Sequence, residues 1–433
     1  MKRLVIKGGR VIDPASGMDG VYNIYVMAGR IASVKPTDKD TTELTPGAPG
    51  LDVIDAAGLL VTPGFVDLHT HLREPGYEYK ETIKTGTEAA AAGGFTTMLC
   101  MANTFPVNDN QSVARYIIKK AEEEGIVRVL PVGALSVGQK GERLTEMFEL
   151  KEAGCVAVSD DGMPVEASPL MRRALEYAKL FGLPVITHAE DPLLAGVGVM
   201  NEGAVSTMLG LPGIPNAAED IMVARDIMLS ELTGGKLHVA HVSTRASVEL
   251  IRRAKERGVN VTAEATPHHL ALTDEAVMGY DTNFKMNPPL RAAADVAALR
   301  EGLGDGTIDC VATDHAPHSV IEKDVEFAKA ANGVVGLETA FSIVYALVEE
   351  GAIDLPRAVK AMTYNPAKAM NLDCGNLRVG SAADVTLIDL NKSWTVLPER
   401  LKSRSKNTPF AGRTLKGIVV KTMVAGEVVY SAD

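Results

Sequence analysis

The stretch GFVDLHTHLREPG, residues 64–76, decides how the fold of this chain is interpreted. An apolar run ends in two histidines one residue apart, and Arg73 and a Pro-Gly turn follow directly. Side chains alternate between the two faces of a strand, so His69 and His71 point the same way and could hold one metal ion. The H-x-H pattern alone also fits two ordinary histidines on an edge strand, so the rest of the chain must decide.

The pattern of this stretch recurs along the chain. Short apolar runs are each followed by a turn of polar or small residues and then by a helical segment. The eight runs are GFVDLHTH, FTTMLCMAN, VRVLPVGAL, CVAVSDDG, PVITHAE, KLHVAHVS, VNVTAEATP and DCVATDHAP. Strands that alternate with helices predict a parallel sheet, and eight units over about 250 residues predict a closed (β/α)8 TIM-type barrel. An open doubly wound sheet is the alternative, although no G-x-G-x-x-G follows a strand.

The two ends of the chain differ from this pattern. Short strands with glycine turns make up LVIKGGRVID and YNIYVMAGRIASV near the N-terminus, and GSAADVTLIDL and GIVVKTMVAGEVVY near the C-terminus. Chain ends usually lie close together at the surface, so we expect both to build one small β domain that flanks the barrel. The predicted division is residues 1–62 and 366–433 for the small β domain and residues 63–365 for the barrel.

The composition is that of a globular protein with ample material for a core. The chain has 433 residues, of which 46% are hydrophobic and 23% charged, and its formal net charge is −11. An acidic chain without basic runs argues against nucleic acid or an anionic membrane as a partner. No segment predicts a signal peptide or a membrane span. Cys100, Cys155, Cys310 and Cys374 show no paired spacing, which predicts reduced cysteines in a cytoplasmic protein.

Residue types that bind metals fall at the ends of the predicted strands. The active site of a (β/α)8 barrel lies at the carboxyl ends of its strands, so these side chains would meet at one mouth. One zinc ion takes about four ligands, so six ligands suit two ions bridged by a carboxylate and a hydroxide. The candidates are His69, His71, Asp160 or Asp161, His188, His241 and Asp314. Asp314 could also accept a proton from an attacking water and pass it to a leaving nitrogen.

Several motifs together resemble one family. DLHTHLREPG, MANTFPVND, SDDG, ITHAED, HVST, TPHHL, KMNPPLR, ATDHAPH and GVVGLETAF are similar to those of type I dihydroorotases, in the amidohydrolase superfamily. The resemblance runs over nearly the whole chain and implies reversible cyclisation of N-carbamoyl-L-aspartate to L-dihydroorotate in pyrimidine biosynthesis. Many relatives bridge their metals with a carboxylated lysine on the fourth strand. CVAVSDDG has no lysine and Lys151 is too far back, which fits type I and argues against a dihydropyrimidinase or hydantoinase.

The resemblance also implies a role for each ligand. It places two zinc ions in each chain, bridged by Asp161 and a hydroxide, with Asp160 left as a structural residue. The first ion is assigned to His69, His71 and Asp314, and the second to His188 and His241.

The expected substrate is a ring that carries a carboxylate. Arg73 can grip that carboxylate with a bidentate fork. The resemblance implies further substrate contacts from Asn103, Asn287, His318, Asn332 and Gly333. Asn103 and Asn287 lie near prolines, where asparagine often serves only to make a turn. We interpret His268 and His269 as core residues.

The sequence leaves two alternative functions open, and it does not decide which macromolecule the chain binds. An allantoinase or hydantoinase would leave Arg73 without a role. A non-catalytic partner of aspartate transcarbamoylase would be expected to have lost metal ligands, and all six are present. The candidate macromolecular partners are a second copy of the chain and aspartate transcarbamoylase.

The segment PHSVIEKDVEFAKAANG, residues 317–333, is long for a loop between a strand and a helix, where about two to six residues are usual. It is rich in charge and has few large apolar residues, so we expect it to have little to bury. The pattern predicts a mobile lid that closes over bound substrate. The alternative is a fixed surface helix.

Overall fold

The structure is a computed structural model that describes residues 3–41 and 51–432. Residues 1–2 and 42–50, which the sequence analysis assigned to the N-terminal part of the small β domain, lie outside the described residues. The same holds for residue 433 at the other end.

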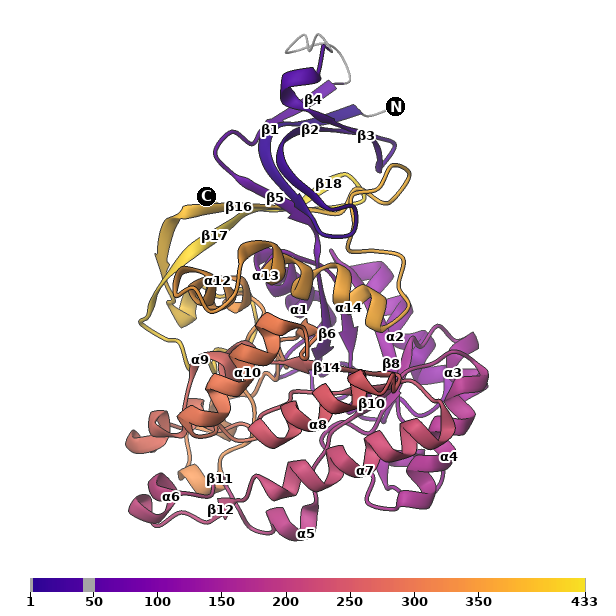
Figure 1. The fold of residues 1–433 in the computed structure, drawn as a ribbon, viewed down its shortest axis with the longest axis vertical. Helices are drawn as coiled ribbons and strands as arrows, with labels where there is room; N and C mark the ends of the chain where they lie inside the picture. The colour runs from indigo at the N-terminus through magenta and orange to yellow at the C-terminus, as the bar shows by residue number, and fades with distance from the viewer. Residues whose placement is uncertain (1–2, 42–50, 433) are drawn as a thin grey trace.

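Eight parallel strands form the barrel that the sequence predicts (Figure 1). They are β6 (Phe65–Thr70), β7 (Phe95–Cys100), β8 (Arg128–Gly133), β9 (Ala157–Ser159), β10 (Val185–Thr187), β13 (Leu237–Val239), β14 (Val261–Ala265) and β15 (Cys310–Val311). Each strand pairs with the next, and a parallel bridge between Thr70 and His315 joins the first strand to the segment after the last. The backbone N–H of His71 also donates to the carbonyl of His315 at 2.9 Å. The sheet is therefore nearly closed, and the open doubly wound alternative is wrong.

Amphipathic helices cover the outside of the barrel. The longest are α2 (Gln111–Glu124), α4 (Ser168–Leu180), α7 (Ala217–Thr233), α8 (Arg245–Glu256) and α10 (Ala293–Asp305). The smaller ones include α1 (Ile83–Ala92), α3 (Met147–Glu152), α12 (Ala340–Glu349), α13 (Leu355–Met362) and α14 (Tyr364–Ala369). In α4 the buried side chains are Met171, Ala174, Leu175 and Ala178, which follow the helical spacing of three and four residues. One face of the helix therefore packs on the barrel and the other is left to solvent.

A small insertion between β10 and α7 was not predicted. It consists of α5 (Pro192–Ala195), β11 (Met200–Asn201), α6 (Ala204–Leu209) and β12 (Gly213–Ile214). These elements are too short for a periodic signal. A tertiary contact holds them instead, because the buried guanidinium of Arg291 donates to the carbonyl of Ile214 at 2.8 Å.

Both ends of the chain build a second sheet, as predicted. Its strands run in the order β18, β17, β16, β5, β1, β2 and β3, and β4 also pairs with β1. Their bounds are β1 (Arg3–Asp13), β2 (Met18–Met27), β3 (Arg30–Pro36), β4 (Leu51–Asp55), β5 (Leu60–Pro63), β16 (Val385–Thr395), β17 (Thr414–Val424) and β18 (Glu427–Ser431). The antiparallel pair of β5 and β16 joins the N-terminal strands to the C-terminal ones.

The second sheet sits at the amino ends of the first barrel strands. The N–H of Gly64, just before β6, donates to the carbonyl of Asp384 at 2.9 Å. The hydroxyl of Thr386 donates to the carbonyl of Gly94, just before β7, at 2.7 Å. Arg128 at the start of β8 forms an ion pair with Asp384. The carboxyl ends of the strands, where the predicted ligands lie, therefore face away from this sheet.

Position 64 shows how tightly the start of β6 is packed. A Cβ atom on Gly64 would lie 2.1 Å from the hydroxyl oxygen of Thr96. Only glycine allows the two strands to approach this closely.

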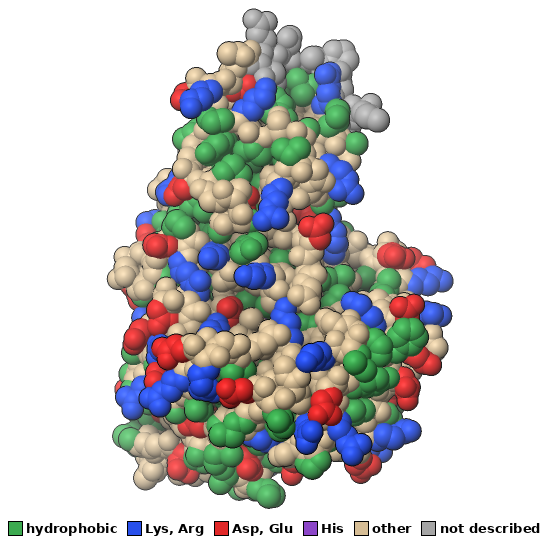
Figure 2. Space-filling model, turned by 45° about the vertical axis from the view of Figure 1, so that its right-hand side comes forward, with side chains coloured by type: hydrophobic (Ala, Val, Ile, Leu, Met, Phe, Trp, Pro, Cys, Tyr) green, Lys and Arg blue, Asp and Glu red, His purple; other side chains and the backbone are tan. Residues whose placement is uncertain are grey.

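The surface carries both signs of charge. On the face shown in Figure 2, lysine and arginine side chains are interspersed with aspartate and glutamate. Within the described part of the chain, no helix combines the length and the apolar character that crossing a membrane would require. All four cysteines are free; Cys100, Cys155 and Cys310 are buried and Cys374 is partly exposed.

Candidate metal centre

The carboxyl ends of five barrel strands bring all six predicted metal ligands together. They come from the end of β6 and from the residues that follow β6, β9, β10, β13 and β15. None of the six is more than 6% exposed. The cluster consists of His69, His71, Asp161, His188, His241 and Asp314.

Asp161 stands at the centre of this cluster. One group of ligand atoms within 4.8 Å of one another comes from Asp161, His69 and His71, and a second comes from Asp161, His188 and His241. Asp161 Oδ1 lies 3.3 Å from His69 Nε2 and 3.4 Å from His241 Nε2. Its other oxygen, Oδ2, lies 3.4 Å from His71 Nε2. The Asp161 carboxylate therefore faces both groups.

Asp314 belongs with the first group. Its Oδ1 lies 3.0 Å from His71 Nε2 and 3.5 Å from His69 Nε2. The side chain is buried but lines the cavity beside the cluster.

The atoms at the centre fit a metal ion. Within the described residues, the buried atoms His69 Nε2 and Asp161 Oδ1 have no hydrogen-bond partner. The ring nitrogens His188 Nδ1 and His241 Nε2 lie 2.8 Å apart. Buried polar atoms are rarely left unpaired in folded proteins, and imidazole nitrogen with carboxylate oxygen is a donor set that suits zinc and related dications. These residues could therefore hold metal.

The electrostatics of the cluster favour a cation. Burial opposes the charged form of Asp161, yet the imidazoles of His69, His188 and His241 hold the pKa of its carboxyl well below the usual range. Burial likewise opposes a charged His69, but the carboxylates of Asp161 and Asp314 raise its pKa well above the ordinary value. Without a metal, protons on the histidines balance the carboxylates, and a metal cation can replace those protons.

Two residues that the sequence analysis missed orient the ring of His69. Glu264 Oε1 lies 2.8 Å from His69 Nδ1, and Glu264 Oε2 lies 3.0 Å from His238 Nε2. Although burial opposes ionisation, His238 and His69 lower the pKa of Glu264 to about 2. An anionic carboxylate on Nδ1 fixes the tautomer of His69 so that Nε2 faces the cluster with its lone pair. A carboxylate among the small and β-branched residues of β14 was the signal available in the sequence.

Asn103 does the same for His71. Its Oδ1 lies 2.8 Å from His71 Nδ1, so the ring donates to the amide oxygen and directs Nε2 to the cluster. The sequence analysis had assigned Asn103 only to the substrate or to a turn.

The remaining polar candidates lie outside the cluster. Both carboxylate oxygens of Asp160 accept hydrogen bonds from Ser136, and Oδ1 also accepts from the N–H of Leu135. Lys151 is an exposed residue of α3. His268 and His269 are buried, and the ring of His269 pairs with Thr266 and with the carbonyl of Pro288.

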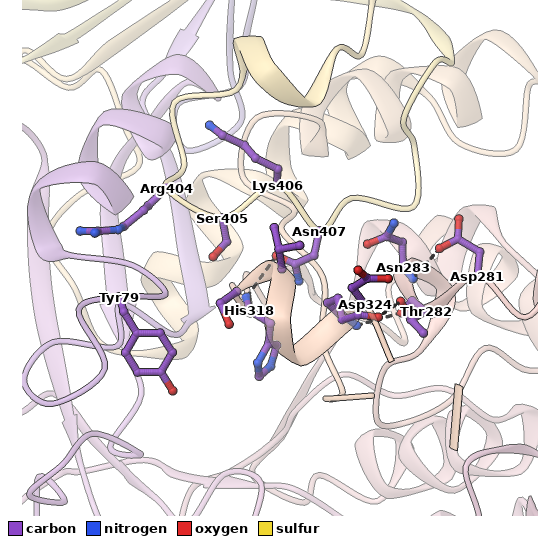
Figure 3. A pocket seen from close by; sticks show the side chains of 13 residues that line it. Tyr79, Asp281, Thr282, Asn283, His318, Asp324, Arg404, Ser405, Lys406 and Asn407 are labelled. Carbon is purple, nitrogen blue, oxygen red and sulfur yellow. Dashed lines mark hydrogen bonds between the residues drawn. The ribbon is translucent and has the colours of Figure 1, made fainter. Parts of the chain in front are cut away.

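A cavity of about 200 Å³ adjoins the cluster. All the predicted substrate-binding residues line it, namely Arg73, Asn103, Asn287, His318, Asn332 and Gly333. A larger cavity of about 530 Å³ shares His318 with it. Tyr79 and Arg404 lie on one side of that larger cavity, and Asp281, Thr282 and Asn283 lie on the other (Figure 3).

Arg73 presents a cation to the smaller cavity. Its Nε donates to the carbonyl of Pro317 at 3.2 Å, and its Nη2 lies 3.3 Å from His318 Nε2. Over residues 3–41 and 51–432, no carboxylate lies within ion-pair distance of the guanidinium. Burial lowers the pKa of Arg73, which nevertheless keeps its charge. The carboxylates of Asp314, Glu322 and Asp161 act on the guanidinium only from beyond ion-pair distance, so it has room for a direct anionic partner.

The segment over residues 317–333 buries more than the sequence suggested. It forms α11 (Val320–Lys323) and a short 3-10 helix η5 (Phe327–Lys329). Phe327 is 5% exposed and packs with Met200 and Val277. The ammonium of Lys323 donates to three backbone carbonyls. The expectation that this segment has little to bury is wrong, and its closure over substrate stays a prediction.

The chain is similar to proteins named dihydroorotase. The one from Geobacter metallireducens is 58% identical over 427 residues, covering 99% of each chain. The one from Geotalea daltonii is 56% identical over 430 residues, covering 99% of this chain and all of its own. A family model described as dihydro-orotase-like matches residues 58–247.

Solved structures support the fold. The L-hydantoinase (dihydropyrimidinase) from Arthrobacter aurescens superimposes with a TM-score of 0.88 at 27% identity, over 100% of this chain and 96% of its own. A D-hydantoinase (dihydropyrimidinase) from Thermus sp. gives a TM-score of 0.81 at 26% identity, over 99% and 95%. The barrel with its small β domain is thus shared with cyclic amidohydrolases.

Glu264→Gln should weaken metal binding. The amide keeps the size of the side chain but removes the anionic acceptor for His69, and such outer partners typically change metal affinity by about 10–100-fold. Competition with a chromophoric chelator measures the affinity. Asp226→Asn is the matched control, because Asp226 is equally buried but pairs with Thr187 and Arg225. Equal affinities in the two variants would contradict the role of Glu264.

Metal binding should release protons. Burial disfavours charge on His188, but Asp161 raises the pKa of His188, as it does that of His69. At neutral pH the metal-free cluster therefore carries protons that zinc must displace, about one or more per chain. Titration calorimetry of metal-free protein in two buffers of different ionisation enthalpy measures this release. Fewer protons should be released as the pH rises above the raised pKa values of His69 and His188. Binding heats that are the same in both buffers would show that zinc displaces no protons.

Proposed function

The chain belongs to the dihydroorotase family, and from this premise we propose that it is a type I dihydroorotase that interconverts N-carbamoyl-L-aspartate and L-dihydroorotate. Relatives named dihydroorotase cover 99% of the chain at 56–58% identity, which supports the activity and a place in pyrimidine biosynthesis. The fourth strand β9 and the SDDG turn after it contain no lysine, which supports the type I assignment.

One observation supports the choice of substrate. The guanidinium of Arg73 lines the same cavity as the metal cluster and, within the described residues, has no carboxylate partner. A buried cation of this kind is stabilised by an anion that arrives with the ligand. Dihydroorotate and N-carbamoyl-aspartate both carry a carboxylate that can fill this place. A ring substrate without a carboxylate would leave Arg73 unpaired.

We propose that the site holds two zinc ions. His69, His71 and Asp314 would hold one, His188 and His241 the other, and Asp161 would bridge them. The unpaired buried atoms of His69 and Asp161 support this assignment. Zinc ions bound there would lower the pKa of water and polarise the carbonyl that it attacks.

The side chains of the site have distinct tasks in the proposed reaction. In the hydrolytic direction, water attacks the ring amide carbonyl, and Asp314 accepts the proton and passes it to the departing ring nitrogen. Asp314 lines the cavity beside the cluster, so its carboxylate lies within reach of both the water and the substrate. Arg73 binds the substrate carboxylate, and Asn103, Asn287, His318, Asn332 and Gly333 contact the rest of the substrate.

The two other functions have less support. The hydantoinases that share the fold are 26–27% identical to this chain in the examples above, against 56–58% for the dihydroorotases. A non-catalytic scaffold does not account for a complete ligand set. A homodimer, an aspartate transcarbamoylase partner, a cytoplasmic location and the division at residues 62 and 365 stay predictions.

Arg73→Met should raise KM for dihydroorotate sharply. Loss of the charged partner of a buried carboxylate costs roughly 3–5 kcal/mol, or about 10²–10⁴-fold in KM. Metal content should stay normal, because Arg73 is not a ligand. Arg404→Met is the control, since Arg404 lines only the larger neighbouring cavity. The assay measures hydrolysis of dihydroorotate and of hydantoin by wild type and both variants. An unchanged KM in Arg73→Met, or a wild type that prefers hydantoin, would overturn the proposed substrate.

Purified wild-type protein should contain about two zinc ions per chain. Asp161→Ala should lower the affinity for both ions, because the carboxylate of Asp161 faces both groups of histidines. Elemental analysis after dialysis measures the content. Asp160→Ala serves as the comparison, since Asp160 pairs with Leu135 and Ser136 instead. Full activity with no more than one tightly bound ion would refute the binuclear site.

A further inference from the structure

The C-terminal part of the chain returns to the mouth of the barrel. Between β16 and β17 lies a segment over residues 401–410, here called the strap. The carboxylate of Glu338 accepts from the N–H of Lys402 at 2.8 Å and from that of Ser403 at 3.1 Å. Glu81 Oε1 accepts from the N–H of Arg404 at 3.0 Å. The strap is thus tied to the barrel over several consecutive residues.

Asn407 is the strap residue that meets the proposed substrate site. It is 5% exposed, and its Oδ1 accepts from the backbone N–H of His318 at 3.1 Å, the contact drawn as a dashed line in Figure 3. Its Nδ2 donates to the carbonyl of Ala316 at 3.2 Å and to that of Gly333 at 3.0 Å. The backbone carbonyl of Asn407 also accepts from the N–H of Val335 at 2.9 Å. One amide therefore joins two loops.

Those two loops carry proposed substrate contacts. The imidazole of His318 donates from Nε2 to the carbonyl of Asn332 at 2.8 Å, so the loops also touch each other directly. Gly333 has φ +129°, and a Cβ there would lie 2.6 Å from Cβ of Ala316. The loop of His318 and the loop of Gly333 therefore pack closely, and contacts between them and their neighbours fix their relative position.

We infer that Asn407 is a positioning residue for the substrate, because its side-chain amide cross-links the loop of His318 to the loop of Asn332 and Gly333. This inference rests on the proposed function. Asn407 lines the larger cavity and not the smaller one, so it acts through these loops and does not touch the substrate.

The chemistry of the side chain is specific. The carbonyl oxygen of the amide accepts one bond and its NH₂ group donates two, which matches the one backbone N–H and two backbone carbonyls around it. A carboxylate in the same place could accept from His318 but would set an anion against the carbonyls of Ala316 and Gly333. Asn407→Asp should therefore disturb the loops although it is nearly isosteric.

The test compares Asn407→Ala and Asn407→Asp with Thr408→Ala. Thr408 is the next residue of the strap and is also buried, but among the described residues its hydroxyl bonds only to the N–H of Phe410, within the strap. We expect KM for dihydroorotate to rise about tenfold or more in both Asn407 variants, with kcat changed less than about threefold. Zinc content should equal that of the wild type, and Thr408→Ala should keep the wild-type KM.

Melting temperatures of all variants separate positioning from general stability. If the strap only stabilises the fold, Asn407→Ala and Thr408→Ala will lose stability and keep the same KM, which would overturn the inference. Asn407→Ser keeps a small polar side chain whose oxygen lies nearer the backbone than Oδ1 of Asn407, so it provides a second variant if the alanine variant does not fold, and its KM should also exceed that of wild type. A wild-type KM in the serine and aspartate variants would also overturn it. A wild type that does not turn over dihydroorotate would instead reject the proposed function.

Discussion

The structure depends on burying four imidazoles and two carboxylates around one point. Groups of this kind are unfavourable in a protein interior unless they are paired, and here Asp161 is the common partner of four histidines. A closed parallel barrel allows this arrangement, because the carboxyl ends of its strands converge and five firmly packed strands supply the six side chains at or just after their ends. Glu264 and Asn103 then fix the rings of His69 and His71, so the constraint extends one layer beyond the ligands.

Three residues in or beside the metal cluster have strained backbone conformations. Arg73, His241 and Asp314 have φ values of +62°, +33° and +46°, a region that residues other than glycine rarely adopt. Such conformations cost of order 1–3 kcal/mol each and persist only when the surroundings hold them in place. All three residues lie two or three positions past the end of a barrel strand, where the chain turns and their side chains line the cavity. The packing of the barrel offsets this strain, which is one reason for a large scaffold around a small cavity.

The sequence predicts the parts of this design that repeat or that follow a strand. The eight apolar runs predict the strands, and His188 and Asp314 can be recognised because each stands near the end of such a run. Glu264 and Asn407 were missed for a different reason, since their partners are 195 and 89 residues away along the chain and no local pattern encodes the contact. The insertion of α5, β11, α6 and β12 is likewise held by Arg291 from elsewhere in the chain. Local sequence therefore predicts which side chains gather at the mouth of the barrel, but not the groups that orient them.

The second sheet packs at one end of the barrel and the metal cluster lies at the other. The strap, which belongs to the chain between two strands of that sheet, reaches the end that carries the cluster. The second sheet packs on the amino ends of the first strands, away from the cluster, and so contributes stability without shaping the cavity. Hydantoinases share this whole architecture, so the barrel and the sheet alone do not select a substrate. In the proposed function, selection comes from what lines the cavity, which includes Arg73 and the two loops that Asn407 joins. Because Asn407 belongs to the chain between β16 and β17, the sheet that stabilises one end of the barrel also supplies a cross-link at the other.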